Sequence, residues 1–219
     1  MLKAVIFDLD GTLTDSDKVH FQVFQEIFAQ KGMVIDEALY RQKISGRQNA
    51  ALVADFFPDL SAADTAAFSI GKEATFRSLA QGQLTPLPGL MDLLTQIQQR
   101  RLAIAVVTNA PNENAVFMLS ELGLADTFSP VIMADDLPRG KPDPLPYQTA
   151  LDHLEIMANE AIAFEDSCTG IRAAVAAGII TIGIMTTHSR SELMAAGATG
   201  AIADFTGLTI ADLEALMKP

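Results

Sequence analysis

K-A-V-I-F-D-L-D-G-T, at residues 3–12, is the most informative segment of this chain of 219 residues. Its uninterrupted apolar run is typical of a strand that is buried on both faces of a parallel sheet. Two aspartates, Asp8 and Asp10, stand at the end of this run, and Asp10-Gly11 is a common turn pair. Because a parallel sheet places ligands outside the carboxyl ends of its strands, we expect both aspartates at a ligand-binding edge.

Further apolar runs and helical patterns alternate along the chain. Strands are predicted at residues 103–107, 131–133, 161–164, 179–184 and 200–203, and helices at 89–101, 112–122, 145–154 and 169–177. Gly178 follows the last of these helices, where a left-handed cap is favoured. Strands that alternate with helices form βαβ units, so the sequence predicts an α/β fold with a doubly wound parallel sheet.

One long segment interrupts the alternation. Residues 17–83 show helical periodicity and no convincing strand, with an apolar stripe formed by Val19, Val23 and Ile27. The segments T-D-S at 14–16 and T-P-L-P-G at 85–89 border it as plausible hinges. We therefore expect an α/β core formed by residues 1–15 and 86–219, with a helical domain at residues 16–85 inserted after the first strand.

Composition excludes several classes of protein. The 15 basic and 27 acidic residues give a net charge of −12, which argues against a nucleic-acid-binding or polybasic membrane-binding protein. The single cysteine, Cys168, excludes a disulfide framework. The longest apolar stretch, residues 173–185, is too short to span a bilayer, and the first apolar run is too short for a secretory signal. We expect a cytoplasmic monomer without nucleic-acid or membrane partners.

Reactive side chains follow four of the predicted strands. A parallel sheet would bring them to one edge, where four carboxylates would repel one another. A divalent cation resolves that conflict, and Mg²⁺ suits oxygen ligands and bridges to a substrate phosphate, while a lysine supplies a further positive charge. These residues are Asp8 and Asp10 after the first strand, Thr108 and Asn109 after the second, Lys141 in the loop after the third, and Glu165 and Asp166 after the fourth.

Each signal alone also has an ordinary structural interpretation. Asp10-Gly11 could be only a turn, and Thr108-Asn109 could simply end a strand. Lys141 could be a solvated charge, and Asp166-Ser167 could be a helix N-cap. Their occurrence after four different predicted strands favours a common function.

At these positions the sequence resembles the haloacid dehalogenase superfamily of phosphohydrolases, in particular its β-phosphoglucomutase and sugar-phosphatase branch. The resemblance covers nearly the whole chain and is carried by D-L-D-G-T-L at 8–13, Thr108, G-K-P-D-P at 140–144 and E-D-S at 165–167. It implies a Mg²⁺-dependent phosphatase that hydrolyses a small phosphorylated metabolite through an aspartyl-phosphate. The helical insert would be a cap domain that closes over the substrate.

The resemblance implies a role for each acidic residue. Asp8 would be the nucleophile, and Asp10 would first protonate the leaving alkoxide and then deprotonate the attacking water. The Mg²⁺ ligands would be Asp8, the carbonyl of Asp10 and Asp166. Glu165 would be a further ligand or an anchor for the others.

The resemblance also implies how the substrate is held. Thr108 and Lys141 would bind the phosphoryl oxygens, assisted by backbone N–H groups near Leu9 and Asn109. Selectivity would come from the cap, although its histidine could equally be a packed helix residue. The cap candidates are His20, Gly46, Arg47 and Lys72.

Phosphatase and mutase remain alternatives within this branch. The mutases share residues like His20 and Lys72, but their cap loop reads like G-V-S-R, whereas residues 46–49 read G-R-Q-N and displace the arginine by two positions. We therefore favour hydrolysis of a sugar phosphate, with a β-phosphoglucomutase-type mutase as the alternative.

Two other phosphate-related folds fit less well. Receiver domains combine similar residues, but their acidic pair precedes the phosphoacceptor, and they have no helical insert. A P-loop is excluded because Gly71-Lys72 and Gly140-Lys141 lack the upstream glycine and the following Ser or Thr.

Overall fold

The computed structural model describes residues 1–44 and 49–217. The chain divides into two compact units, which we call the core unit (Met1–Asp15 with Leu84–Pro219) and the helical unit (Ser16–Gln83). Among the described residues, none of the helices has both the length and the apolar character that crossing a bilayer requires.

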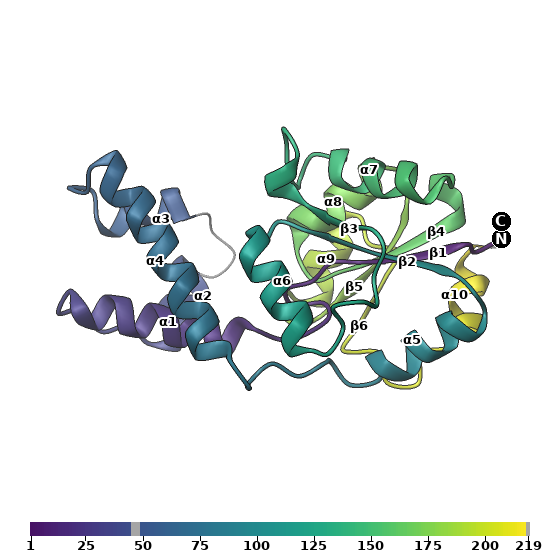
Figure 1. Cartoon of the computed structure of the whole chain (residues 1–219), viewed down its shortest axis with the longest axis horizontal. Helices are drawn as coiled ribbons and strands as arrows, with labels where there is room; N and C mark the ends of the chain where they lie inside the picture. Colours follow the sequence, from purple (N-terminus) through teal and green to yellow (C-terminus); the bar gives the residue numbers. More distant parts are fainter. Residues whose placement is uncertain (45–48, 218–219) are drawn as a thin grey trace. The chain divides into compact units, whose positions relative to one another are not determined.

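The core unit is built on a six-stranded parallel sheet, which confirms the predicted α/β class (Figure 1). Its spatial order is β3-β2-β1-β4-β5-β6, so the chain leaves β1 toward one edge and later returns to the other side of β1. This reversal makes the carboxyl end of β1 the topological switch point, where such sheets bind ligands. The strands are β1 (Ala4–Phe7), β2 (Ala103–Thr108), β3 (Val131–Met133), β4 (Ala161–Glu165), β5 (Ile180–Ile184) and β6 (Gly200–Ile202).

Helices cover both faces of this sheet (Figure 1). On one face, α7 packs against β2 and β3, and α8 packs against β4 and β5. Gly178 follows α8 with a φ of +84°, so the predicted left-handed cap is confirmed. The helices of the core unit are α5 (Leu90–Gln99), α6 (Asn112–Glu121), α7 (Leu145–Leu154), α8 (Cys168–Ala176), α9 (Arg190–Ala196) and α10 (Ile210–Leu216), with short 3₁₀ turns η1 (Ala134–Asp136) and η2 (Ala158–Glu160).

The strands bury a different kind of side chain on each face. On the opposite face from α7, the ring of Phe7 stacks on Phe164 with centroids 5.4 Å apart and meets Phe205 edge-on. Small and aliphatic side chains fill the face that α7 and α8 cover, which lets these helices approach closely. This second cluster includes Ala4, Ile6, Ala105, Val107, Tyr147, Ala150, Ala161, Ala163 and Ala173.

Strand register decides where the acidic residues lie. Phe7 pairs with Val106 on one side and with Phe164 on the other. The Asp8 N–H continues this ladder and donates to the Phe164 carbonyl at 3.0 Å. Because side chains alternate along a strand, Asp8 and Glu165 both turn away from the phenylalanine face and toward α7.

The helical unit contains α1 (Asp17–Gln30), α2 (Glu37–Lys43), α3 (Asn49–Phe56) and α4 (Ala62–Ala80). The described residues between 16 and 83 contain no strand. α1 packs against α4, and Val19 and Val23 of the predicted stripe are buried. An aromatic and aliphatic core of its own, which includes Phe24, Phe28 and Tyr40, accounts for its separate compactness.

Candidate active site

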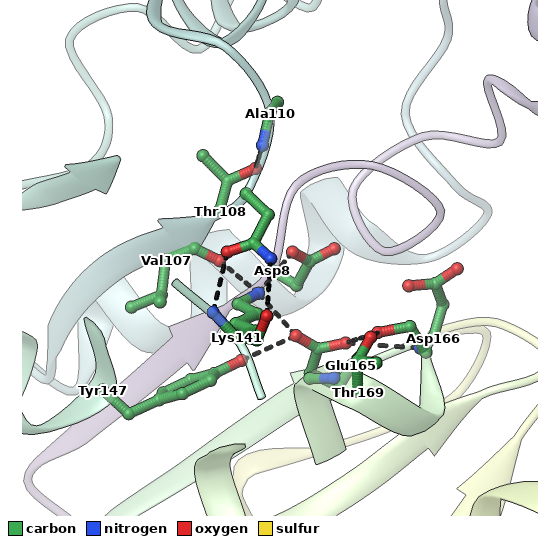
Figure 2. A network of polar contacts seen from close by, with 12 residues as sticks. Asp8, Val107, Thr108, Ala110, Lys141, Tyr147, Glu165, Asp166 and Thr169 are labelled. Carbon is green, nitrogen blue, oxygen red and sulfur yellow. Dashed lines mark hydrogen bonds and ion pairs between the residues drawn. The ribbon is translucent and has the colours of Figure 1, made fainter. Parts of the chain in front are cut away.

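Three acidic residues and one lysine meet at the carboxyl ends of β1 and β4 (Figure 2). Asp8, Glu165 and Asp166 are all buried, and one carboxylate oxygen of each lies within 4.8 Å of the others. Lys141 reaches this group from the loop that precedes α7. The structure therefore brings together four of the residues that the sequence singled out, namely Asp8, Lys141, Glu165 and Asp166.

The ammonium of Lys141 occupies the centre of the cluster (Figure 2). Its Nζ donates to Asp8 Oδ1 at 2.6 Å, to Glu165 Oε1 at 2.5 Å and to the Val107 carbonyl at 2.7 Å. An ammonium has three N–H donors, so each of them has a protein partner. The side chain is only 4% exposed, which strengthens each of these charged contacts.

Glu165 is held on both of its oxygens. Oε1 accepts from Lys141 and from the Tyr147 hydroxyl at 3.0 Å. Oε2 accepts from the Ser167 N–H at 3.3 Å and from the Ser167 hydroxyl at 3.0 Å. A β-carbon at Gly170 would overlap this carboxylate, so α8 can begin beside Glu165 only with glycine there. Four donors saturate the acceptor capacity of Glu165 and fix its orientation.

Thr108 and Asn109 lie at the end of β2, next to the loop that carries Lys141, which we call the lysine loop. Asn109 Oδ1 accepts from the Lys141 N–H at 3.0 Å, and Asn109 Nδ2 donates to the Lys141 carbonyl at 3.1 Å. This reciprocal pair fastens the lysine loop to β2. The Thr108 hydroxyl, which is buried, accepts from the Ala110 N–H at 2.9 Å.

Asp166 is fixed by the loop that follows β5. The Thr187 hydroxyl donates to Asp166 Oδ2, and His188 Nδ1 lies 3.1 Å from the Asp166 carbonyl. The Thr186 hydroxyl donates to the Gly11 carbonyl at 2.6 Å, so the same loop also holds the turn after β1. Two consecutive threonines thereby connect both acidic segments.

The protonation of the aspartates reflects their burial. Burial, the largest cause, raises the pKa of Asp8 to about 7; the Lys141 ammonium opposes the rise, and Glu165 adds to it. Burial also raises the pKa of Asp166 well above its usual range, and the Asp8 carboxylate adds to that rise. The cluster therefore holds more acidic groups than its one lysine can neutralise.

A divalent metal fits this donor set. A cation beside Asp8 and Asp166 would favour their charged forms and balance the excess of carboxylates. Mg²⁺ prefers oxygen ligands, and it is usually bound by one or two carboxylates together with water and substrate phosphate. The buried carboxylates Asp8, Glu165 and Asp166 are thus a possible metal site.

Of the other predicted residues, Asp10 acts electrostatically on both Asp8 and Asp166. Leu9 is buried and its carbonyl accepts from the Leu13 N–H, while Asp10 is half-buried in the turn that follows. In the helical unit, the ring of His20 stacks on Phe76 at 4.3 Å, and Lys72 pairs with Glu73 at 2.8 Å. The remaining candidates, Gly46 and Arg47, lie outside the described residues.

Sequence reasoning missed several groups that complete the site. Tyr147 lies on the apolar face of α7, so the pattern indicates only a core position. His188 resembles an ordinary loop residue, and Thr187 carries no motif. Ser167 is the N-cap of α8, as its alternative interpretation predicted, and it also binds Glu165.

The chain is similar to known proteins over most of its length. The model of the haloacid dehalogenase-like hydrolase family matches residues 5–193. The chain is 36% identical to validoxylamine A 7'-phosphate phosphatase of Streptomyces hygroscopicus subsp. limoneus, over 88% of this chain and 90% of that protein. It is 34% identical to phosphoglycolate phosphatase of Rhodospirillum rubrum, over 95% of this chain and 90% of that protein.

A solved structure extends the comparison to three dimensions. A mutant of CbbY from Rhodobacter sphaeroides, crystallised in complex with xylulose-(1,5)bisphosphate, has a TM-score of 0.83 against this chain at 28% identity. The alignment covers 97% of this chain and 99% of that one.

Proposed function

This chain belongs to the haloacid dehalogenase-like hydrolases and is a phosphatase, and we propose that it hydrolyses a small phosphorylated carbohydrate through a covalent intermediate on Asp8. The observation that carries the proposal is the Lys141 ammonium, which bonds Asp8 at 2.6 Å and Glu165 at 2.5 Å beside Asp166. Phosphoryl transfer needs a placed nucleophile and neutralisation of charge on the phosphoryl oxygens. This cluster supplies both.

The reaction has two steps. In the first, an Asp8 oxygen attacks phosphorus and the ester P–O bond breaks, while Asp10 gives its proton to the departing alkoxide. In the second, a water molecule attacks phosphorus and gives a proton to Asp10, and the bond between Asp8 and phosphorus breaks. Inorganic phosphate leaves, and both aspartates return to their starting forms.

Lys141 has to change one partner for this reaction to occur. All three of its N–H donors are used within the protein, so a phosphoryl oxygen can be bound only in exchange for one of them. The contact with Asp8 is the one to exchange, because the Asp8 carboxylate becomes the attacking group. The contacts with Glu165 and with the Val107 carbonyl then remain as fixed supports.

Asp8 and Asp166 fit the role of metal ligands, together with the Asp10 carbonyl that the family resemblance implies. Mg²⁺, when bound there, neutralises negative charge on Asp8 and on the phosphoryl oxygens. Glu165 fits the role of anchor better than that of ligand, because four protein donors already occupy its oxygens. Thr108 and the N–H groups near Leu9 and Asn109 remain our candidates for the phosphoryl oxygens.

The substrate class is supported by the relatives rather than by a contact. Their names specify a validoxylamine phosphate and phosphoglycolate as substrates, and the CbbY crystal contains a sugar bisphosphate. We propose that the helical unit acts as the cap and that four of its residues select the sugar. Its candidates are His20, Lys72 and, outside the described residues, Gly46 and Arg47.

The test combines a substrate screen with one substitution. Purified protein with Mg²⁺ should release phosphate from p-nitrophenyl phosphate and from one or more of a panel of sugar phosphates. Asp8→Asn should reduce release to the uncatalysed background, because an amide is no nucleophile, whereas Asp152→Asn on the exposed face of α7 should leave it unchanged. Substantial activity of Asp8→Asn would rule out the covalent route.

The mutase alternative has a separate readout. Glucose 1-phosphate with a catalytic amount of glucose 1,6-bisphosphate should yield inorganic phosphate. Formation of glucose 6-phosphate as the main product would reverse the assignment in favour of the mutase.

A further inference from the structure

We propose that the hydroxyl of Tyr147 is a positioning group for phosphoryl transfer, because it holds Glu165 and thereby fixes the Lys141 ammonium beside Asp8. The inference rests on the proposed function. It assigns a role to a residue that belongs to no sequence motif and whose contacts in the cluster are with Glu165 and Lys141.

Tyr147 reaches the cluster from below, on the first turn of α7 (Figure 2). Its side chain is fully buried, and its hydroxyl donates to Glu165 Oε1 at 3.0 Å. The same oxygen accepts from Lys141 Nζ at 2.5 Å. The ammonium also lies over the tyrosine ring, 5.2 Å from its centroid. Ring and hydroxyl therefore contact two different members of the cluster.

The hydroxyl is not needed for packing. The neighbours of Tyr147 in its core cluster are aliphatic, among them Ile6, Ala105 and Ala163. A phenylalanine would fill the same volume, and it would avoid the cost of burying a polar group. A hydroxyl in these surroundings is accounted for by its acceptor, the Glu165 carboxylate, because hydrogen bonds to charged groups are stronger than neutral ones.

The consequence concerns the moment at which Lys141 exchanges its partner. When the ammonium turns from Asp8 to a phosphoryl oxygen, Glu165 must stay in place to support it. Ser167 holds Oε2, but among the residues that the structure describes Oε1 is held only by Lys141 itself and by Tyr147. Without the Tyr147 hydroxyl, Glu165 Oε1 would be free to move together with the Lys141 ammonium that it supports. The rigid ring, buried in the core, therefore keeps Oε1 independent of the lysine.

The decisive variant is Tyr147→Phe, which keeps the ring under the ammonium and removes only the hydroxyl. We expect kcat for p-nitrophenyl phosphate to fall roughly tenfold, as loss of one hydrogen bond to a charged group allows. The inhibition constant of orthovanadate, which mimics the geometry of phosphoryl transfer, should rise by the same factor. Both values report the placement of Lys141, which a purely structural tyrosine would not affect.

Tyr40→Phe is the matched control. Tyr40 is also buried, and its hydroxyl likewise donates to a carboxylate, Asp17 Oδ1, at 2.7 Å, but within the helical unit. Both variants should lower the melting temperature by a similar amount. Only Tyr147→Phe should change kcat and orthovanadate inhibition.

A double-mutant cycle tests whether the hydroxyl acts through Glu165. In a Glu165→Gln background, Tyr147→Phe should cause no further loss, because the anchor is already impaired. Independent, multiplying losses would overturn the proposal. An unchanged kcat and an unchanged orthovanadate constant in folded Tyr147→Phe would overturn it as well, even if Glu165→Gln fails to fold. Failure of the proposed function gives a different result, since Asp8→Asn would then be as active as the unmodified chain.

Discussion

Gly11 lies so close to the Asp166 carboxylate that a β-carbon on Gly11 would overlap it. Gly11 also has a φ of +83°, and its carbonyl is held by the Thr186 hydroxyl at 2.6 Å. The turn after β1 and the end of β4 are thereby kept at one fixed separation. That separation sets the distance between Asp8 and Asp166, the two carboxylates that we assign to the metal.

Gly11→Ala should therefore disable the site more than it destabilises the fold. The left-handed backbone costs an alanine about 1 kcal/mol, and the overlap displaces the Asp166 carboxylate. We expect phosphatase activity to fall roughly a hundredfold, since a misplacement of about 1 Å at an active site can cost that factor in rate. Steady-state kinetics and thermal unfolding measure the two effects separately.

Gly123→Ala is the control for the backbone cost alone. Gly123 has a φ of +69°, but nothing lies within 4 Å of the position that a β-carbon would take. Its variant should lose a similar amount of stability and keep full activity. Equal activities for the two alanine variants would contradict the close approach of Gly11 and Asp166.

Lys141→Met should reduce both stability and activity. It leaves the buried carboxylates of Asp8 and Glu165 without the cation that they share, which costs about 3 kcal/mol or more in the free energy of unfolding. Arg139→Met breaks an ion pair with Asp143 whose arginine side chain is 67% exposed, and should cost less than about 1 kcal/mol. Chemical denaturation measures both values, and a Lys141→Met loss as small as that of Arg139→Met would count against the buried network.

Thr187→Val should weaken metal binding. The Thr187 hydroxyl donates to Asp166 Oδ2, and groups that orient a metal ligand typically contribute at least about tenfold to affinity. Calorimetric titration with Mg²⁺ should therefore show roughly a tenfold weaker affinity. Thr187→Ser keeps the hydroxyl and should bind Mg²⁺ like the unmodified chain; a valine variant with normal affinity would refute the role.

Removal of divalent metal should stop turnover without unfolding the protein. EDTA should abolish phosphate release from p-nitrophenyl phosphate, and an excess of Mg²⁺ should restore it. Asp166→Asn should raise the concentration of Mg²⁺ needed for half-maximal activity. Turnover that persists in EDTA after dialysis would contradict a metal held by Asp8 and Asp166.

Much of this architecture could be predicted from the sequence. The apolar runs ending at Asp8, Thr108 and Glu165 are short and alternate with helical patterns, which favours strands buried on both faces of a parallel sheet. The convergence of these residues follows from the parallel arrangement alone. Lys141 joins them because its loop starts the helix that covers β2 and β3.

The remaining contacts depend on packing that no local pattern specifies. Tyr147 follows the apolar periodicity of α7, and its acceptor is 18 residues away at the end of β4. Thr187 and His188 lie in an ordinary polar loop, and only the crossover from β4 to β5 brings them to Asp166. Hydroxyl groups are common in loops and helices, so a sequence pattern does not indicate their hydrogen-bond partners. The partners can be identified only when the arrangement of the strands is known.

The pairing of Phe7 with Phe164 fixes the position of Asp8 relative to Glu165, because each acidic residue directly follows its phenylalanine. One residue inserted between Ala4 and Phe7 would turn Asp8 toward the phenylalanine rings, because neighbours on a strand face opposite ways. Two inserted residues would restore its direction but carry it about 7 Å past Glu165. We therefore expect connecting loops that carry no residue of the site to vary in length between relatives, while the spacing along this short strand stays constant.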